Sequence, residues 1–244
     1  MKALVFAAGL GERMRPLTDT TPKPLLAAGG KPLIAWHLER LAATGVDEVV
    51  VNVSWLAERF PEALGDGGAF GLRITWSHEG AVPLETGGGM LHALPLLGDA
   101  PFIAINGDIW TDFDFAGLPR EPAGDAHLVL VDNPAHNPRG DFILRPDGRL
   151  ASEDDAGPRL TFAGIGVYRP RLLQGWREVI GDAPGAGEVP PRFRLAPLLR
   201  AAMARGAVTG EHHHGAWTDV GTPQRLEALD RALAQRGPAG IRPG

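Results

Sequence analysis

The first half of the chain alternates short, unbroken apolar runs with segments of helical periodicity. The apolar runs cover residues 3–7, 46–53, 72–76 and 102–105, and the helical patterns cover 32–45, 55–64 and 89–97. A strand that is apolar at every position is buried on both faces, as in a parallel sheet covered by helices on both sides. The pattern therefore predicts an α/β fold with a mixed, mainly parallel sheet sandwiched by helices.

The second half of the chain is less regular. It predicts strands over 127–131, 141–144 and 160–168, and helices over 195–205 and 223–235. Residues 182–191 are rich in Gly and Pro and predict a surface loop, and residues 237–244 predict a disordered tail. Because no linker is long enough to separate two domains, we predict one domain over residues 1–236.

Composition and charge exclude several classes of function. The chain has no cysteine, which excludes disulfides, thiolate catalysis and Cys-based metal sites. Its net charge of −5 provides no positive field for a polyanion, so we expect no nucleic-acid partner. No stretch approaches the roughly 20 apolar residues of a membrane helix, and the first apolar run is too short for a signal peptide. We therefore expect a cytoplasmic protein with no membrane partner.

A glycine-rich segment, residues 7–16, follows the first predicted strand. Gly9 and Gly11 allow backbone N–H groups to approach an anion closely, and Arg13 and Arg15 add charge that suits phosphate. The segment is not a dinucleotide fingerprint, because Met14 stands at the third glycine position, and it lacks the Gly-Lys-Ser/Thr of a Walker A loop. Alone, it is as consistent with an ordinary tight turn.

Three charged residues elsewhere suit a metal-bound triphosphate. Lys23 is flanked by two prolines, which hold it in an extended segment as a point charge. Asp108 follows the predicted strand 102–105, and Asp219 precedes the helix that begins near Pro223. Mg²⁺ commonly binds one or two carboxylates and completes its shell with water and phosphate oxygens. The alternatives are a solvated lysine and aspartates in turns or helix caps.

Two further segments allow a structural or a functional interpretation. Thr86-Gly87-Gly88-Gly89 leaves room for a flat base or sugar against bare backbone, or forms a flexible loop. The run His212-His213-His214 could bind a metal, but neighbouring residues do not share a helix face, so we favour a surface loop there.

Taken together and in this order, these segments resemble the sugar-1-phosphate nucleotidylyltransferases. The resemblance covers about residues 1–233 and rests on Ala8-Gly9-x-Gly11-x-Arg13-Met14-x-Pro16-Leu17, Pro22-Lys23-Pro24, Asn106-Gly107-Asp108 and Asp219-Val220-Gly221-Thr222. Residues 83–89, 93–102, 128–134, 139–142 and 210–212 are most similar to family members that act on N-acetylmuramate 1-phosphate in bacterial cell-wall (peptidoglycan) recycling. Joint occurrence makes the match specific where each motif alone is weak.

The resemblance implies a nucleotide-diphospho-sugar transferase fold and a Mg²⁺-dependent transfer of a uridylyl group from UTP to N-acetylmuramate 1-phosphate. It implies catalytic roles for Arg13, Lys23 and Asp108, and a Mg²⁺ site at Asp108 and Asp219. The implied nucleotide-binding residues are Ala8, Gly9, Gly11, Glu12, Arg13, Lys23, Thr86 and Gly87. The implied sugar-phosphate-binding residues are Asn106, Gly140, Asp141 and Asp219.

The sequence departs from the family pattern more around the acceptor than around the nucleotide. Many relatives that use other sugars carry Gly where Glu85 stands, and Arg194 replaces an expected Lys. Candidate cations for the lactyl carboxylate of N-acetylmuramate are Arg139, Arg192 and Arg194. Another base or sugar remains an alternative, as in the mannose or heptose guanylyltransferases and glucose thymidylyltransferases.

A catalytically silent nucleotide-sugar sensor is an alternative of another class. The presence of all four charged residues of the motifs, Arg13, Lys23, Asp108 and Asp219, argues against it. A dinucleotide-dependent dehydrogenase is disfavoured by Met14 and by the lack of an acidic residue at the end of the second strand.

Overall fold

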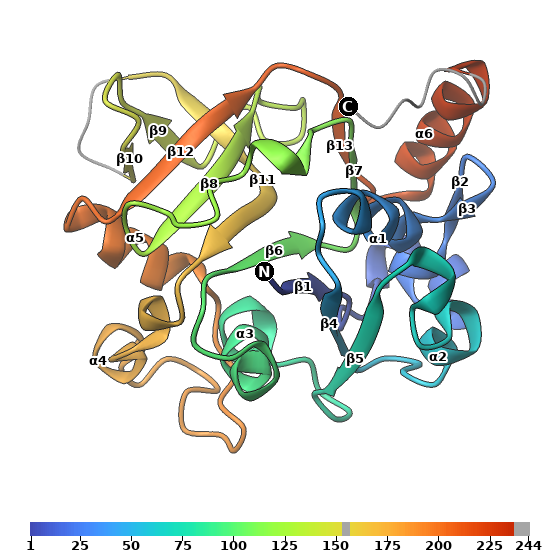
Figure 1. Ribbon diagram of the computed structural model, residues 1–244, viewed down its shortest axis with the longest axis horizontal. Helices are drawn as coiled ribbons and strands as arrows, with labels where there is room; N and C mark the ends of the chain where they lie inside the picture. The colour runs from blue at the N-terminus through green and yellow to red at the C-terminus, as the bar shows by residue number, and fades with distance from the viewer. Residues whose placement is uncertain (153–156, 237–244) are drawn as a thin grey trace. The chain divides into compact units, whose positions relative to one another are not determined.

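The computed structural model describes residues 1–152 and 157–236, and Figure 1 shows its helices and strands. The tail expected at 237–244 lies outside the described residues. The chain divides into two compact units, each drawn from separate stretches of sequence. Unit 1 comprises 1–83, 105–117 and 216–244, and unit 2 comprises 84–104 and 118–215. The prediction of a single domain over 1–236 stays a prediction.

Unit 1 contains the parallel strands expected from the apolar runs. β1 (Ala3–Phe6) pairs in parallel with β4 (Glu48–Val53), which pairs in parallel with β5 (Arg73–His78). On the other side of β1 lies β6 (Phe102–Asn106), whose last two residues belong to this unit. Nearly every residue of β1 and β4 is buried, which explains their unbroken apolar sequences.

The described residues of unit 1 include three α-helices. α1 (Leu33–Ala43) and α2 (Arg59–Leu64) lie beside β4 and β5, and α6 (Pro223–Arg236) closes the described chain (Figure 1). The helix expected over 55–64 begins only at Arg59, because Leu56 adopts a φ of 49° that a right-handed helix cannot accommodate. Gly45, with a φ of 80°, follows α1 as expected.

Short strands complete unit 1. β2 (Ala27–Ala28) pairs with β3 (Lys31–Pro32), and β7 (Ile109–Thr111) pairs with β13 (Trp217–Asp219), both antiparallel. A buried cluster packs around an edge-to-face pair of Trp36 and Trp110, with ring centroids 6.2 Å apart. The cluster includes residues of α6, so the C-terminal helix is anchored on the core of this unit.

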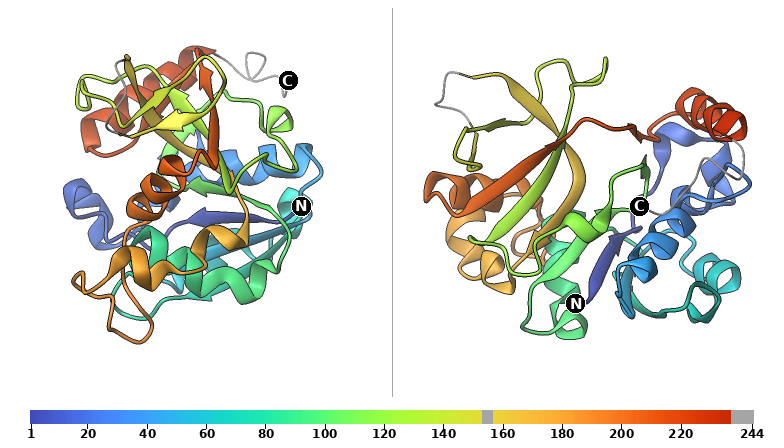
Figure 2. Two further views of the ribbon diagram at one scale, coloured as in Figure 1. Left: turned by 90° about the vertical axis from the view of Figure 1, so that its left-hand side faces the viewer. Right: turned by 45° about the horizontal axis from the view of Figure 1, so that its top comes forward.

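Unit 2 is built on a mixed sheet. β11 (Arg159–Tyr168) pairs antiparallel with β8 (Ala126–Val131) on one side and with β9 (Phe142–Leu144) on the other. β12 (Val208–His213) extends the sheet by pairing in parallel with β8, and β10 (Leu150–Ala151) pairs antiparallel with β9. The two views of Figure 2 show β8, β11 and β12 side by side.

In the part of unit 2 that the structure describes, the α-helices are α3 (Glu85–Leu97), α4 (Trp176–Ile180) and α5 (Ala196–Ala204). The helix expected over 89–97 begins four residues earlier, at Glu85, so the three glycines lie inside its first turns. Residues 182–191 contain no helix or strand, and Val189 is almost fully exposed, which confirms the surface loop.

The expectation of a surface loop at His212-His213-His214 is wrong. His212 and His213 belong to β12, and only His214 lies beyond its end. The sequence Val-Thr-Gly-Glu-His-His carries no strong apolar pattern, because five of its six residues are only half-buried.

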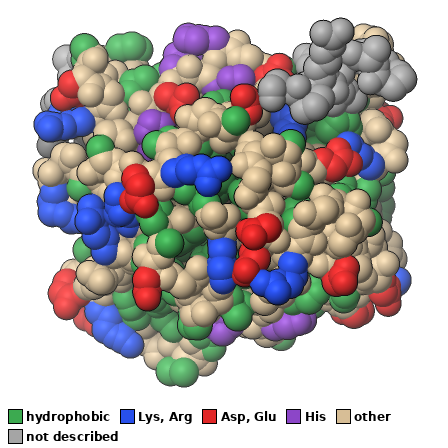
Figure 3. Space-filling model, in the orientation of Figure 1, with side chains coloured by type: hydrophobic (Ala, Val, Ile, Leu, Met, Phe, Trp, Pro, Cys, Tyr) green, Lys and Arg blue, Asp and Glu red, His purple; other side chains and the backbone are tan. Residues whose placement is uncertain are grey.

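The expectations of no nucleic-acid partner and no membrane partner concern the charged surface and the helices. Acidic and basic side chains are interspersed over the face that Figure 3 shows. Among the described residues, none of the helices is both long and apolar enough to cross a membrane.

Candidate active site

A chain of buried hydrogen bonds joins the carboxyl ends of the three parallel strands in unit 1. The N–H of Ala7 donates to Oδ1 of Asn52 at 2.6 Å, and Nδ2 of Asn52 donates to Oε1 of Glu79 at 2.6 Å. Both polar side chains are buried, and ligands in open α/β sheets bind beyond these strand ends. Sequence reasoning missed Asn52 and Glu79. The available signal was an amide inside a run of buried valines.

The glycine-rich loop begins directly after this network. Gly9 is exposed and borders open space, so its backbone is accessible to a ligand. Gly11 has a φ of 66°, and a Cβ atom there would lie 2.8 Å from Cγ2 of Thr18. The hydroxyl of Thr18 donates to the Gly11 carbonyl at 2.8 Å, which holds the loop closed. Only glycine fits this position, for both conformation and space.

The predicted phosphate-binding side chains extend outward from this loop. Glu12 and Arg13 are exposed, whereas the next residue, Met14, is fully buried and anchors the turn. Within residues 1–152 and 157–236, Arg13 makes no ion pair. Its guanidinium is therefore available to an anionic ligand.

Lys23 and Asp108 form an ion pair, 85 residues apart in sequence. Nζ of Lys23 lies 2.5 Å from Oδ2 of Asp108. The lysine side chain is only 11% exposed and the aspartate side chain 38%, so the pair lies at the edge of the core and not in open solvent. The solvated lysine that was one alternative for Lys23 is wrong.

A close backbone contact places Asp108. Asn106 ends β6, and the N–H of Gly107 donates to the carbonyl of Phe6, the last residue of β1, at 2.9 Å. A Cβ atom on Gly107 would lie 2.8 Å from that oxygen, so the approach requires glycine. The residue after Gly107 is therefore held beside the strand that leads into the glycine-rich loop.

The pairing of β13 with β7 brings the backbone of Asp219 next to that of Asp108. In the β7–β13 ladder Asp219 is opposite Ile109, and the N–H of Val220 donates to the carbonyl of Asp108 at 2.8 Å. The two predicted metal-binding aspartates, 111 positions apart, thus occupy adjacent places on paired backbones. Sequence reasoning could name each residue but could not show that their backbones are adjacent.

Arg225 is a site residue that sequence reasoning missed. Its Nη1 lies 2.5 Å from Oδ1 of Asp219, and both side chains are about one-quarter exposed. The Thr222 hydroxyl accepts from the N–H of Arg225 at 3.3 Å, so Thr222 caps α6 and positions the arginine. An Arg in the first turn of a helix that follows an Asp was the only available signal.

A buried histidine, His37, contacts strand β7 of the β7–β13 pair. His37, on α1, has Nε2 2.9 Å from the carbonyl of Ile109, and its ring stacks on Phe115. Burial lowers the pKa of His37 from 6.5 to about 4, so the ring is neutral at neutral pH. Nε2 of neutral His37 donates to the carbonyl of Ile109, the first residue of β7 and the residue after Asp108.

In unit 2, the space beside the helix glycines is filled by the chain itself. The N–H groups of Gly87 and Gly88 donate to the Phe193 carbonyl at 2.9 and 3.0 Å, and the Phe193 ring packs where a Cβ of Gly87 would lie. The Thr86 hydroxyl accepts from the N–H of Leu195 at 3.0 Å. These contacts explain Gly87 and Gly88 by close packing, whereas sequence reasoning offered either room for a flat base or sugar, or a flexible loop.

Glu85, which begins this helix, has a φ of 62°. This left-handed conformation favours glycine over a residue with a side chain. Its carboxylate lies 3.7 Å from Nε of Arg194, whose side chain is 78% exposed.

Gly140 and Asp141 lie in a braced loop of unit 2, away from α3 in sequence. Gly140 has a φ of 63°, and a Cβ there would lie 2.7 Å from Oδ1 of Asn133. Both carboxylate oxygens of Asp141 accept hydrogen bonds, one from Nδ2 of Asn137 at 3.2 Å and one from the N–H of Phe162 at 2.8 Å. Asp141 therefore holds the loop in shape.

The three arginines proposed for the acceptor differ in their partners. Arg192 pairs with Glu188 at 3.0 Å, and Arg194 pairs with Glu85. Arg139, next to Gly140, is exposed and makes no ion pair with any residue that the structure describes. Of the three, Arg139 carries the charge that is available to a ligand.

Known proteins are similar to this chain over most of its length. The nucleotidyl transferase family model matches residues 2–139. The chain is 50% identical over 241 residues to the N-acetylmuramate alpha-1-phosphate uridylyltransferase of Neisseria meningitidis, covering 96% of this chain and 98% of that protein. It is 37% identical to the protein of the same name from Caulobacter vibrioides, covering 96% and 97%.

A solved structure confirms the fold. A putative glucose-1-phosphate thymidylyltransferase from Bacillus anthracis superposes with a TM-score of 0.78 at 20% identity, covering 95% of both chains. The expected nucleotide-diphospho-sugar transferase fold, with its mixed, mainly parallel sheet and flanking helices, is therefore correct. The sequence match spans more than half of the chain, and we conclude that this protein belongs to the nucleotidyl transferase family.

Proposed function

We propose that the protein transfers a uridylyl group from UTP to N-acetylmuramate 1-phosphate, giving UDP-N-acetylmuramate and diphosphate. The observation that carries this proposal is the 50% identity, over almost the whole of both chains, to a protein named for that reaction. The neighbouring Asp108 and Asp219, with Lys23 on Asp108, give the proposal its chemistry. The place of action would be the cytoplasm, where UTP is available, in the recycling of peptidoglycan.

The proposed metal is Mg²⁺, held by Asp108 and Asp219. The donor set fits, because Mg²⁺ prefers carboxylate oxygens and takes one or two of them together with substrate phosphates. Each carboxylate is now balanced by a cation, Lys23 or Arg225, so neither negative charge is left alone near the core. When bound, Mg²⁺ would neutralise charge on the triphosphate.

Lys23 is proposed to bind the triphosphate. An ammonium group has three N–H donors, and one is used on Asp108, so two remain for phosphate oxygens. Burial of the lysine stem fixes the charge in one place, so little reorganisation is needed when the nucleotide binds. Arg13 and the N–H groups near Gly9 and Gly11 would bind the same phosphates from the loop.

The reaction itself requires no general base. The second pKa of a phosphomonoester is about 6, so the acceptor is largely dianionic at neutral pH. One of its oxygens forms a bond to the α-phosphorus of UTP, and the bond from that phosphorus to the diphosphate breaks. The protein has to align the two reactants and stabilise the departing charge, which the fixed positions of Lys23 and Asp108 suit.

For the acceptor, we propose that Arg139 binds the lactyl carboxylate. It is the candidate arginine without an ion pair among the described residues, and it adjoins Gly140, whose conformation fixes the loop. A charged hydrogen bond to that carboxylate would be absent with N-acetylglucosamine 1-phosphate. The loss would favour the muramate substrate by about 1–3 kcal/mol.

The test is a matrix of nucleoside triphosphates against sugar 1-phosphates, with diphosphate release measured with and without Mg²⁺. We expect the highest kcat/KM for UTP with N-acetylmuramate 1-phosphate, and no turnover in a chelator. A clear preference for GTP or dTTP, or for N-acetylglucosamine 1-phosphate, would refute the substrate assignment but leave the family unchanged. No turnover with any pair would refute the enzyme assignment and favour a nucleotide-sugar sensor.

A further inference from the structure

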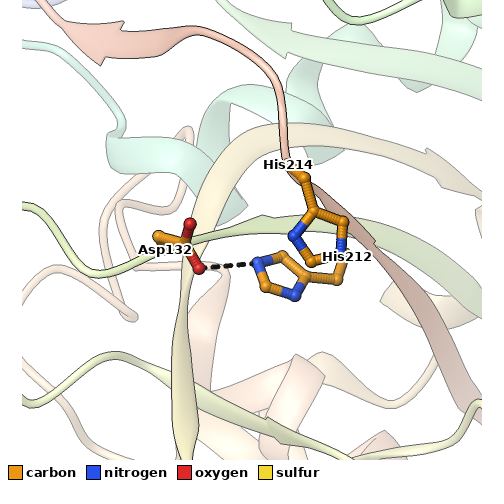
Figure 4. A group of neighbouring side chains, drawn as sticks. All are labelled: Asp132, His212 and His214. Atoms are coloured by element: carbon orange, nitrogen blue, oxygen red, sulfur yellow. Dashed lines mark hydrogen bonds and ion pairs between the residues drawn. The ribbon is translucent and has the colours of Figure 1, made fainter.

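Two histidines and an aspartate meet at one end of the sheet in unit 2 (Figure 4). β8 and β12 run parallel, with Leu130 opposite His212 and Val131 opposite His213. Asp132 follows the end of β8, and His214 follows the end of β12. Because the strands are parallel and in register, their next residues emerge at the same edge of the sheet.

Strand geometry explains why these side chains face one another. Successive side chains of a strand point to opposite faces, so His212 and His214 share one face, and His213 points to the other. Nε2 of His212 lies 3.0 Å from Oδ1 of Asp132. The rings of His212 and His214 have centroids 3.9 Å apart, and one ligand atom from each of the three residues lies within 4.8 Å of the others.

These separations are close to what a small metal ion requires. Zinc binds His nitrogen at about 2.0–2.1 Å and carboxylate oxygen at about 2.0–2.2 Å in tetrahedral geometry, which places two ligand atoms about 3.4 Å apart. The distance from His212 Nε2 to Asp132 Oδ1 is 3.0 Å, and all three ligand atoms lie within 4.8 Å of one another. These two distances bracket about 3.4 Å, so small side-chain rotations would bring the three atoms to tetrahedral spacing. Two imidazoles with one carboxylate form catalytic Zn²⁺ sites, and the same donor set also binds Fe²⁺, whereas Mg²⁺ prefers oxygen ligands alone.

We propose that Asp132, His212 and His214 form a Zn²⁺ site that is separate from the aspartates of unit 1. The Asp132 side chain is 79% exposed and that of His212 21%, so an ion can enter from solvent. Three protein ligands leave a fourth position for water or an anionic ligand. Asp132 leads into the loop that contains Gly140 and Asp141, and the bound ion would tie the start of that loop to the end of β12.

The test is a competition titration of the full-length protein, without a histidine tag, against a chromogenic zinc chelator in excess Mg²⁺. We expect one Zn²⁺ per chain. His212→Ala, His214→Ala and Asp132→Asn should each weaken binding by more than about tenfold, since each removes a ligand. His213→Ala is the matched control, because it removes a neighbouring imidazole from the opposite face, and it should bind as wild type does. Circular dichroism of each variant in chelator should match wild type.

Two results of the titration would overturn the proposal. One is a wild-type protein that binds zinc no more tightly than His212→Ala does. The other is zinc binding that survives in His212→Ala but is lost in Asp108→Asn, because the ion would then occupy the carboxylates of unit 1. Anomalous diffraction at the zinc edge of zinc-soaked crystals gives a direct check. A peak between Asp132, His212 and His214 supports the site, and a peak elsewhere alone refutes it.

Discussion

The buried His37 makes the stability of this protein depend on pH in a way that can be calculated. Its pKa in the folded chain is about 4, compared with 6.5 for an unperturbed histidine. The unfolded state therefore binds one more proton than the folded state between these two pH values. Stability from this residue is fully present above about pH 6.5 and is lost as the pH falls toward 4.

The magnitude follows from the difference between the two pKa values. One pKa unit corresponds to about 1.4 kcal/mol, so the full loss is about 3 kcal/mol. Between about pH 7 and pH 5 the free energy of unfolding should fall by about 2 kcal/mol through His37 alone. A loss of this size is a large fraction of the roughly 5–15 kcal/mol that stabilises a typical domain.

The assay is denaturant unfolding of wild type and His37→Gln at about pH 7 and pH 5. Glutamine keeps an N–H donor for the carbonyl of Ile109 but does not titrate in this range. The wild-type loss should exceed that of the variant by about 2 kcal/mol. His92→Gln, at an exposed position on α3, should retain the wild-type dependence.

Equal losses in wild type and His37→Gln would refute the reasoning. They would mean that the folded protein accommodates protonated His37 without opening, for example by admitting water to the ring. A variant that unfolds at both pH values would not decide the matter, so the comparison requires that His37→Gln remain cooperative at pH 7. If His37→Gln does not unfold cooperatively, the pKa of His37 can be measured in folded wild type by NMR titration. A pKa near 6.5 would refute the prediction equally.

The remaining predictions concern turnover and substrate choice. Asp108→Asn and Asp219→Asn should each lower kcat at least about 100-fold with the fold intact, because a carboxylate ligand is lost. Near-normal rates at low Mg²⁺ would contradict the two-carboxylate site. Lys23→Ala should lower kcat/KM for UTP about 10- to 100-fold, and Lys23→Arg should restore only part of it, since a planar fork differs from a point charge. Unchanged UTP kinetics in the alanine variant would remove Lys23 from the site. Arg139→Ala should narrow the preference for muramate over glucosamine 1-phosphate about tenfold without altering the KM for UTP. Arg194→Ala, the control for a paired arginine, should retain the preference for muramate. If Arg194→Ala loses the preference and Arg139→Ala keeps it, Arg194 binds the lactyl carboxylate instead.

The α/β architecture of unit 1 could be predicted from the sequence because its signal is local. Strands buried on both faces require apolar residues at every position, and the runs at 3–7 and 46–53 satisfy that requirement without reference to the rest of the chain. Asp108 could be named as a candidate for the same reason, because it follows a recognisable buried strand.

The partners of these residues could not be predicted. Asp219 meets the backbone of Asp108 only through the β7–β13 ladder, and Lys23 reaches Asp108 only because Gly107 approaches β1 closely. The helix glycines show the same limit, since a bare backbone can admit either a base or another segment of chain. The choice between them depends on residues about a hundred positions away.

The polar strand β12 is the clearest case of secondary structure that depends on tertiary contacts. Its residues are mostly half-buried and have no apolar periodicity, so by themselves they favour a loop. They form a strand because β8 offers unpaired backbone groups along its length, and hydrogen bonds between backbones do not depend on the side chains. Apolar periodicity therefore determined, from the sequence alone, which segments are buried. Pairing between distant backbones decided which polar residues become neighbours, because pairing depends on register and not on composition. It brings Asp219 next to the backbone of Asp108, and the side chain of Asp132 to that of His212.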